Sequence, residues 1–158
     1  MLKEFEFFHG VVFSRILHGR KNEIIVKNHI TPDNSSYVVN GIGIYVKYST
    51  KRMSPWRFSF LKEHQDNILD MKNKFGEVYT ILVCNDDGIV CLNFEELKEV
   101  LDVKHDSIEW ISVGRGPREK YEVKGHDGSL RLKIGNSDFP DKIFRKTKKK
   151  TGLFSWLK

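Results

Sequence analysis

Apolar residues recur along this chain with two spacings, one typical of helices and one of strands. The helical spacing predicts an amphipathic helix over residues 3–17 and a second helix over residues 61–75. Asn93, followed by Glu96 three residues later, matches a capping box and predicts the start of a third helix. Between these segments the pattern changes to that of strands.

Segments rich in β-branched and aromatic residues alternate with the predicted helices. A strand is expected over residues 23–30, and residues 35–49 predict a hairpin, because Asn40-Gly41 is a pair that two-residue turns favour. Residues 78–84 are apolar almost throughout, which is typical of a strand covered on both faces.

A second hairpin is expected immediately afterwards. Asp87-Gly88 predicts a two-residue turn into a strand over residues 89–92, and this turn would make Cys84 and Cys91 cross-strand neighbours, both buried as free thiols. Three further short strands are expected over residues 109–113, 121–124 and 130–134.

This order of elements predicts an α/β fold. We expect a mixed central β-sheet flanked by helices over about residues 3–102, followed by a small C-terminal β extension over about 109–144. The chain has 158 residues, which suits one compact domain over residues 1–144. Residues 145–158 are expected to form a flexible basic and aromatic tail.

The net charge of +6 is unevenly placed along the chain. Residues 142–158 hold seven basic side chains and no acid, and residues 1–62 carry a net charge of +6. Residues 63–109 carry a net charge of −8. Positive charge at both ends of a chain suits binding to a polyanion.

One face of the predicted hairpin carries a lysine. Alternation along the second strand places Tyr45 and Lys47 on the same face, and a two-residue turn would set Ser36 opposite Tyr45 and Asn34 opposite Lys47. Residues 45–62 contain five basic side chains and no acid, so we expect a cationic and aromatic surface here.

Such a surface suits nucleic acid, because cations bind phosphates and an exposed tryptophan stacks on bases. The alternative is that the indole anchors its loop to the core and that the cations are only solvated. The expected nucleic-acid-binding residues are Lys47, Lys51, Arg52, Trp56 and Arg57, together with Arg115 and Arg118 of a later basic loop.

The order helix, strand, strand, strand, helix, strand, with Ile-Tyr-Val-Lys-Tyr-Ser as the third strand, resembles the PD-(D/E)XK nuclease-like superfamily. Holliday-junction resolvases and many restriction enzymes belong to this superfamily. The likeness covers about residues 3–102 and rests more on layout than on a specific motif. It implies a restriction-endonuclease-like αβββαβ core, with Lys47 and Gln65 as catalytic residues.

The residues depart from that family at its metal site. The family places an acid two residues before the lysine and an aspartate on the preceding strand, whereas this chain has Tyr45 and either Ser36 or Asn34 there. Mg²⁺ needs oxygen ligands that usually include carboxylates. We therefore expect a nuclease-like fold without the standard metal-dependent cleavage. The alternative is an active DNA endonuclease that uses Mg²⁺ and takes its missing carboxylate from Asp33, Glu23 or Glu6.

The remaining candidate chemistry is sparse. The six histidines show no metal-ligand spacing, and His64 is expected on the surface of its helix. Two cysteines cannot form a four-thiolate zinc site. No segment is apolar enough to span a bilayer, and MLKEFEFF lacks the layout of a signal peptide, so we expect a cytoplasmic protein.

The sequence thus favours a nucleic-acid-associated protein, with DNA or RNA as its partner. A third hypothesis is a non-catalytic subunit or inhibitor in a larger complex. In that case either the acidic residues 63–109 or the aromatic end of residues 145–158 would form the interface with a protein partner.

Overall fold

The computed structural model describes residues 1–19, 23–104 and 107–145, and it has a mixed α/β architecture. The helices are α1 (Glu4–His18), α2 (Lys62–Phe75), α3 (Phe94–Val100) and α4 (Asp141–Phe144). The strands are β1 (Val26–Asn28), β2 (Ser36–Val39), β3 (Ile42–Ser49), β4 (Trp56–Phe60), β5 (Val78–Cys84), β6 (Gly88–Asn93), β7 (Glu109–Gly114), β8 (Glu122–Gly125) and β9 (Gly128–Ser129).

The larger sheet, sheet A, has the strand order β1-β2-β3-β5-β6. Its neighbours are antiparallel except for β3 and β5, which run parallel and are joined by a crossover through β4 and α2. The predicted mixed sheet flanked by helices is therefore confirmed, with β4 as an addition between the third strand and the second helix.

The first hairpin forms as its turn residues predict. Asn40 and Gly41 both have positive φ angles, 49° and 79°, as a two-residue hairpin turn requires. Ser36 pairs with Tyr45, which confirms the predicted register. Gly43 and Tyr45 therefore face α2, while Ile44 between them faces the opposite side of the sheet.

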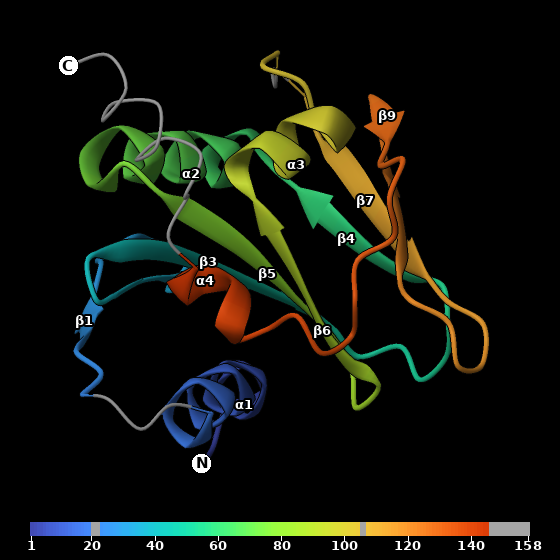
Figure 1. Ribbon diagram of the computed structural model, residues 1–158. Coiled ribbons are helices and arrows are strands. Elements are labelled where there is room, and N and C mark those ends of the chain that lie inside the picture. Colours follow the sequence, from blue (N-terminus) through green and yellow to red (C-terminus); the bar gives the residue numbers. More distant parts are fainter. Residues whose placement is uncertain (20–22, 105–106, 146–158) are drawn as a thin grey trace, which may run out of the picture.

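Sheet A lies between two layers of helix (Figure 1). One core contains Val12 and Ile16 of α1, Ile143 of α4 and the side chains of one face of the sheet. The other face packs against α2, α3 and the second sheet. All seven residues of β5 are buried, which confirms the expectation of a strand covered on both faces.

The second sheet, sheet B, is antiparallel with the order β4-β7-β8-β9. The residues of β4 were expected in a cationic surface loop, and the C-terminal strands in a separate extension. Both expectations are wrong. Trp56, Phe58 and Phe60 are buried in the core shared with sheet A, and β4 pairs with β7 of the C-terminal part. The strand forms because these three aromatic residues alternate with exposed Arg57 and Ser59.

The predicted register of the second hairpin is also wrong. Cys84 pairs with Gly88 and Cys91 with Ile81, because the turn spans three residues, 85–87, rather than two. The two cysteines consequently enter opposite cores, although both are buried and free as expected.

Other expectations are confirmed only in part. The capping box forms, with Asn93 Oδ1 accepting the backbone N–H of Glu96 at 2.8 Å. The strand expected over residues 23–30 is limited to β1, and that over 130–134 to a single bridge between Ile134 and Tyr121. Residues 146–158 lie outside the described part of the chain, and so does nearly all of the predicted tail. None of the described helices has the length and apolar character needed to cross a membrane.

The close approach of β8 to α3 gives a test of this packing. A Cβ atom at Gly125 would lie 2.5 Å from the backbone oxygen of Val100, so Gly125→Ala must displace the end of α3. We expect a loss of about 1–3 kcal/mol in the free energy of unfolding, measured by urea denaturation. Gly10→Ala, at an exposed position of α1 with no atom near the added Cβ, should instead stabilise by about 0.5–1 kcal/mol. Equal stabilities of the two variants would contradict the packing described.

Candidate functional site

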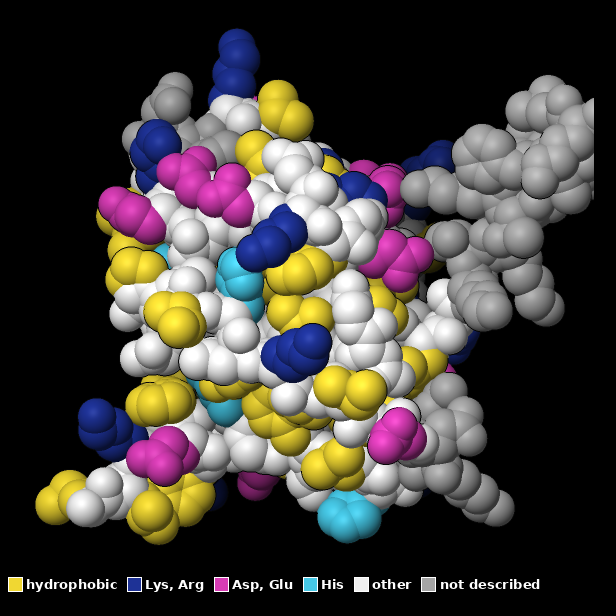
Figure 2. All heavy atoms as spheres, turned by 90° about the vertical axis from the view of Figure 1, so that its left-hand side faces the viewer, with side chains coloured by type: hydrophobic (Ala, Val, Ile, Leu, Met, Phe, Trp, Pro, Cys, Tyr) yellow, Lys and Arg dark blue, Asp and Glu magenta, His cyan; other side chains and the backbone are white. Residues whose placement is uncertain are grey.

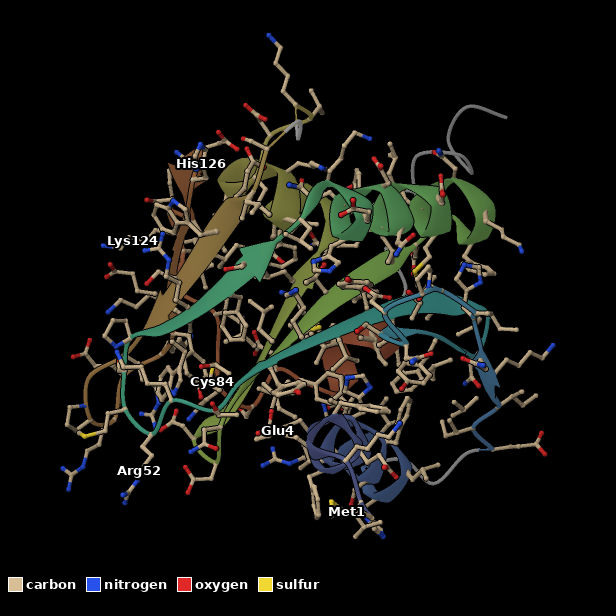
Figure 3. The ribbon with its side chains drawn as sticks, turned by 180° about the vertical axis from the view of Figure 1, so that it is seen from behind. Met1, Glu4, Arg52, Cys84, Lys124 and His126 are labelled. Atoms are coloured by element: carbon tan, nitrogen blue, oxygen red, sulfur yellow. The ribbon has the colours of Figure 1, made fainter. Side chains whose placement is uncertain are left out.

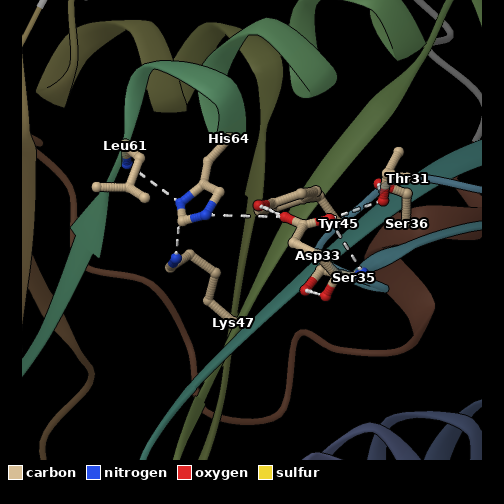
Figure 4. A network of polar contacts seen from close by, with 8 residues as sticks. All are labelled: Thr31, Asp33, Ser35, Ser36, Tyr45, Lys47, Leu61 and His64. Atoms are coloured by element: carbon tan, nitrogen blue, oxygen red, sulfur yellow. Dashed lines mark hydrogen bonds and ion pairs between the residues drawn. The ribbon is translucent and has the colours of Figure 1, made fainter.

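Lys47 projects from β3 toward α2 and is half-buried. Its ammonium lies 4.9 Å from the ring centroid of Phe60 and 3.1 Å from Nδ1 of His64, at the start of α2 (Figure 4). The lysine is therefore enclosed by an aromatic ring and an imidazole.

The hydrogen bonds around His64 fix its tautomer. The backbone N–H of Leu61 donates to Nδ1 at 3.1 Å, and Lys47 Nζ approaches the same nitrogen. Nδ1 must therefore carry a lone pair, which leaves the hydrogen of the neutral imidazole on Nε2. Nε2 faces Asp33 Oδ2 at 3.9 Å, a distance for electrostatic attraction rather than a hydrogen bond.

Asp33 reaches this site from the loop before β2. Its carboxylate accepts the hydroxyl hydrogen of Tyr45, the hydroxyl of Thr31 at 2.7 Å and the backbone N–H of Ser35 at 3.4 Å. Asp33 was expected here only as an alternative. Its carboxylate reaches the Lys47 site with the hairpin register as predicted, because the loop turns back at Asn34, whose φ is 56°.

These surroundings set the protonation of the three groups. Burial lowers the pKa of Lys47 to about 8, although the negative charge of Asp33 opposes this. Burial, followed by the charge of Lys47, also lowers the pKa of His64. Burial disfavours ionisation of Asp33, but the hydrogen bonds that it accepts outweigh burial and hold its pKa below the usual value. An ionised carboxylate, a neutral imidazole and a readily deprotonated amine thus stand in a row.

This arrangement can hold and move protons, but it does not provide the ligands of a nuclease metal site. In the described part of the chain, no three His, Cys, Asp or Glu side chains gather around Lys47. Tyr45 occupies the position of the family's acid, and burial, together with Asp33, raises the pKa of its hydroxyl, so it stays neutral. Asp33 is the carboxylate whose charge acts on the lysine.

The other two candidate carboxylates lie elsewhere. Glu6 is exposed on α1, which covers the opposite face of sheet A, and its side chain accepts the backbone N–H of Lys3 at 2.8 Å. Glu23 is exposed in the segment that leads into β1. Neither is brought to Lys47.

A hollow of about 450 Å³ opens beside His64 and Asp33. Its lining is acidic rather than cationic, because Glu63 and Asp66 also contribute carboxylates. The cationic surface expected over residues 45–62 therefore does not extend into this hollow. Gln65 is buried, and its amide nitrogen donates to Glu109 of β7 at 2.8 Å.

The predicted nucleic-acid-binding residues separate into two groups. Trp56 is 2% exposed and its Nε1 donates to the backbone oxygen of Lys51 at 2.8 Å, so its indole anchors the loop and is not available to stack on bases. Arg115 forms two hydrogen bonds to Asp87, of 2.7 and 2.9 Å, and is committed to an ion pair. Arg52 and Arg118 remain exposed on loops at one end of sheet B.

Arg57 belongs to a surface that the sequence analysis did not identify, the outer face of sheet B. Here Arg57 pairs with Ser112, which pairs with Lys124, so the three side chains form one row across β4, β7 and β8. Trp110 lies on the same face, and the Arg57 guanidinium stands 4.5 Å from its ring centroid.

His126 adds an imidazole to this face, 6.4 Å from the Trp110 ring. Lys124 and His126 lie on the same side of the molecule, with Arg52 on a loop farther along it (Figure 3). We call Arg57, Trp110, Ser112, Lys124 and His126 the sheet B face.

A different surface lies at the β1 edge of sheet A, where hydrophobic side chains are interspersed with cations and histidine (Figure 2). Ile25 and Ile30 are exposed, and a hollow of about 410 Å³ has Lys27 and Lys74 in its lining. This edge is separate from both the Lys47 site and the sheet B face.

Several residues of these sites were missed for identifiable reasons. The alternation of apolar and polar residues in Trp56–Phe60 was a usable signal for β4, and the alternation in Glu109–Gly114 places Trp110 outward. His64 was expected on the surface, and only its contact with Lys47 reveals its role. That contact depends on tertiary structure.

In comparisons with family models, curated proteins and solved structures, nothing matches this chain. The resemblance to PD-(D/E)XK nucleases therefore stays a prediction.

The low pKa of Lys47 predicts a pH-dependent effect of its removal. Below pH 8 the folded protein holds a charged, half-buried amine, so Lys47→Met should stabilise it. Between pH 8 and about 10.5 the unfolded chain keeps a proton that the folded chain has lost, so the wild type gains stability relative to Lys47→Met. The advantage of the variant should shrink by at most about 3 kcal/mol over this range, as measured by urea denaturation. The exposed Lys74, replaced by Met, provides the control; a constant advantage for Lys47→Met would contradict the assignment.

The same substitution should raise the pKa of His64, because the positive charge that lowers it is removed. The measurement is an NMR pH titration of the histidine ring signals in the wild type and in Lys47→Met. His18, an exposed histidine on α1, is the internal reference for the measurement. An unchanged His64 titration would show that the two groups do not interact.

Proposed function

We propose that this protein binds single-stranded nucleic acid through the sheet B face. The observation that carries the proposal is the stack of Arg57 on Trp110, with Lys124 on the row that contains Arg57. Single-stranded nucleic acids are bound by surfaces that combine stacking planes with cations along the backbone.

The geometry of the pair suits a splayed base. Trp110 is half-buried and Arg57 is exposed, with the guanidinium carbon 4.5 Å from the centroid of the indole ring. A base that stacks against this pair would extend the existing arrangement. Lys124 lies two strands away, at about 10 Å, and would contact the phosphate backbone.

The distribution of charge supports the same direction. Six of the acidic residues between positions 63 and 109 lie on α2 and α3. The outer face of sheet B carries Arg57 and Lys124 together with an exposed acid, Glu122 of β8. Arg52 and Arg118 continue the positive charge on loops beyond the end of β4 and β7 where Trp56 pairs with Val113. A strand of nucleic acid would therefore run along the sheet from these loops toward His126.

We propose binding rather than cleavage. Metal-dependent cleavage needs an ion to activate water and to stabilise the developing negative charge. At Lys47 the position of the family's acid is taken by a neutral tyrosine, and Asp33 is already engaged by three donors. The Lys47 site is also separate from the sheet B face, so Lys47 is not part of the proposed surface.

The test is fluorescence anisotropy with labelled single-stranded DNA, single-stranded RNA and duplex DNA between 50 and 200 mM salt. We expect binding to the single strands that weakens as salt rises. Trp110→Leu should weaken binding by about 1–3 kcal/mol through lost stacking, with little change in the salt dependence. Lys124→Ala should lower the slope of log K against log salt by about 0.7, the value for one phosphate contact on a single strand.

Lys27→Ala is the matched control, since Lys27 is an exposed strand lysine at the β1 edge. It should bind as the wild type does. The proposal fails if the wild type does not bind single strands at 50 mM salt, or if the Trp110 and Lys124 variants bind as tightly as the Lys27 variant.

A further inference from the structure

Three potential metal ligands gather at one end of sheet B. One ligand atom each from Glu109, His126 and Asp127 lies within 4.8 Å of the other two, and in the described part of the chain this is the only such group. Zinc–ligand bonds of about 2.0–2.2 Å separate the ligands of a tetrahedral site by about 3.3 Å. Small side-chain rotations would therefore close this group around an ion.

The backbone holds these residues in place from three directions. Glu109 begins β7, opposite Phe60 of β4, and is 4% exposed. His126 and Asp127 occupy the turn between β8 and β9, and their backbone N–H groups donate at 2.9 Å to the oxygens of Trp110 and Val100. The turn is thus fixed both to β7 and to the end of α3.

The side chain that binds Glu109 carries a buried oxygen with no hydrogen-bond partner among the described residues. The Gln65 amide nitrogen donates to Glu109 Oε1 at 2.8 Å, so the amide oxygen points to the other side of the amide group. Gln65 is 1% exposed, so this oxygen is also out of reach of bulk solvent. A half-turn of the amide would bring the oxygen to the position of the nitrogen, beside Glu109, where a bound cation would satisfy it.

We propose that Glu109, His126 and Asp127 bind a divalent transition-metal ion, with the Gln65 amide turned over so that its oxygen rather than its nitrogen faces the ion. The imidazole nitrogen favours zinc or manganese over magnesium and calcium, which prefer oxygen ligands alone. The ion would connect α2, β7 and the β8–β9 turn. This site is distinct from the metal position predicted beside Lys47, and it goes beyond nucleic-acid binding.

The experiment uses full-length protein treated with EDTA, dialysed, and titrated with ZnCl₂, MnCl₂, MgCl₂ or CaCl₂ at pH 7. Isothermal titration calorimetry and thermal unfolding report binding and stabilisation. We expect zinc or manganese to bind with one-to-one stoichiometry and to raise the unfolding temperature, with no comparable effect of magnesium or calcium. Because Cys84 and Cys91 are buried, they do not compete for the ion in the folded protein.

Variants at exposed positions separate this site from others. His126→Ala and Asp127→Asn change exposed side chains and should weaken binding by more than the roughly 10–100-fold lost with an outer-sphere partner. His18→Ala and Asp86→Asn, an exposed histidine and an exposed aspartate elsewhere, should bind as the wild type does.

Two results would overturn the proposal. One is that neither zinc nor manganese binds to or stabilises the wild type. The other is that the His126 and Asp127 variants bind the ion as tightly as the His18 and Asp86 variants.

Discussion

The parallel pairing of β3 with β5 is the constraint on which the rest of this structure depends. Parallel neighbours cannot be joined by a tight turn, so the chain must cross from the end of β3 to the start of β5. Here the crossover contains β4 and α2. After β3 the chain leaves sheet A, and β4 becomes the first strand of sheet B. The helix α2 then crosses back over the face of sheet A that carries Lys47. The Lys47 site and the Glu109 group both follow from this one connection, because α2 brings His64 to Lys47 and Gln65 to Glu109.

Local signals were sufficient wherever the neighbours in space are also neighbours in sequence. The Asn40-Gly41 turn fixed the register of β2 on β3, and Asn93 with Glu96 marked the start of α3. The turn after β5 was less predictable, since Asn85, Asp86, Asp87 and Gly88 all favour turns and two loop lengths were available. A change of one residue in loop length is enough to move cross-strand partners to opposite faces.

The candidate sites were predictable in direction but not in composition. Strand alternation placed Lys47 on the face of Tyr45, whereas only the family resemblance singled out Gln65. Their partners come from distant positions in the sequence. Asp33 belongs to the loop before β2, and Glu109 to β7, which follows α3 in the chain. Contacts at such sequence separations are set by how sheet B docks on sheet A, which the pattern of single residues does not encode. The two clusters also illustrate how charge density misleads, since residues 45–62, with five cations and no acid, contribute a buried indole and an enclosed ammonium.

The ion pair of Arg115 with Asp87 has a consequence for the behaviour of the whole molecule. Asp87 lies at the tip of the β5–β6 hairpin of sheet A and also accepts the hydroxyl hydrogen of Tyr121 at 2.6 Å, whereas Arg115 and Tyr121 belong to the chain that forms sheet B. Amide hydrogens protected by β7 and β8 would then exchange with solvent in the same opening event as those of the hairpin. The two sheets would form a single cooperative unit rather than two that open independently.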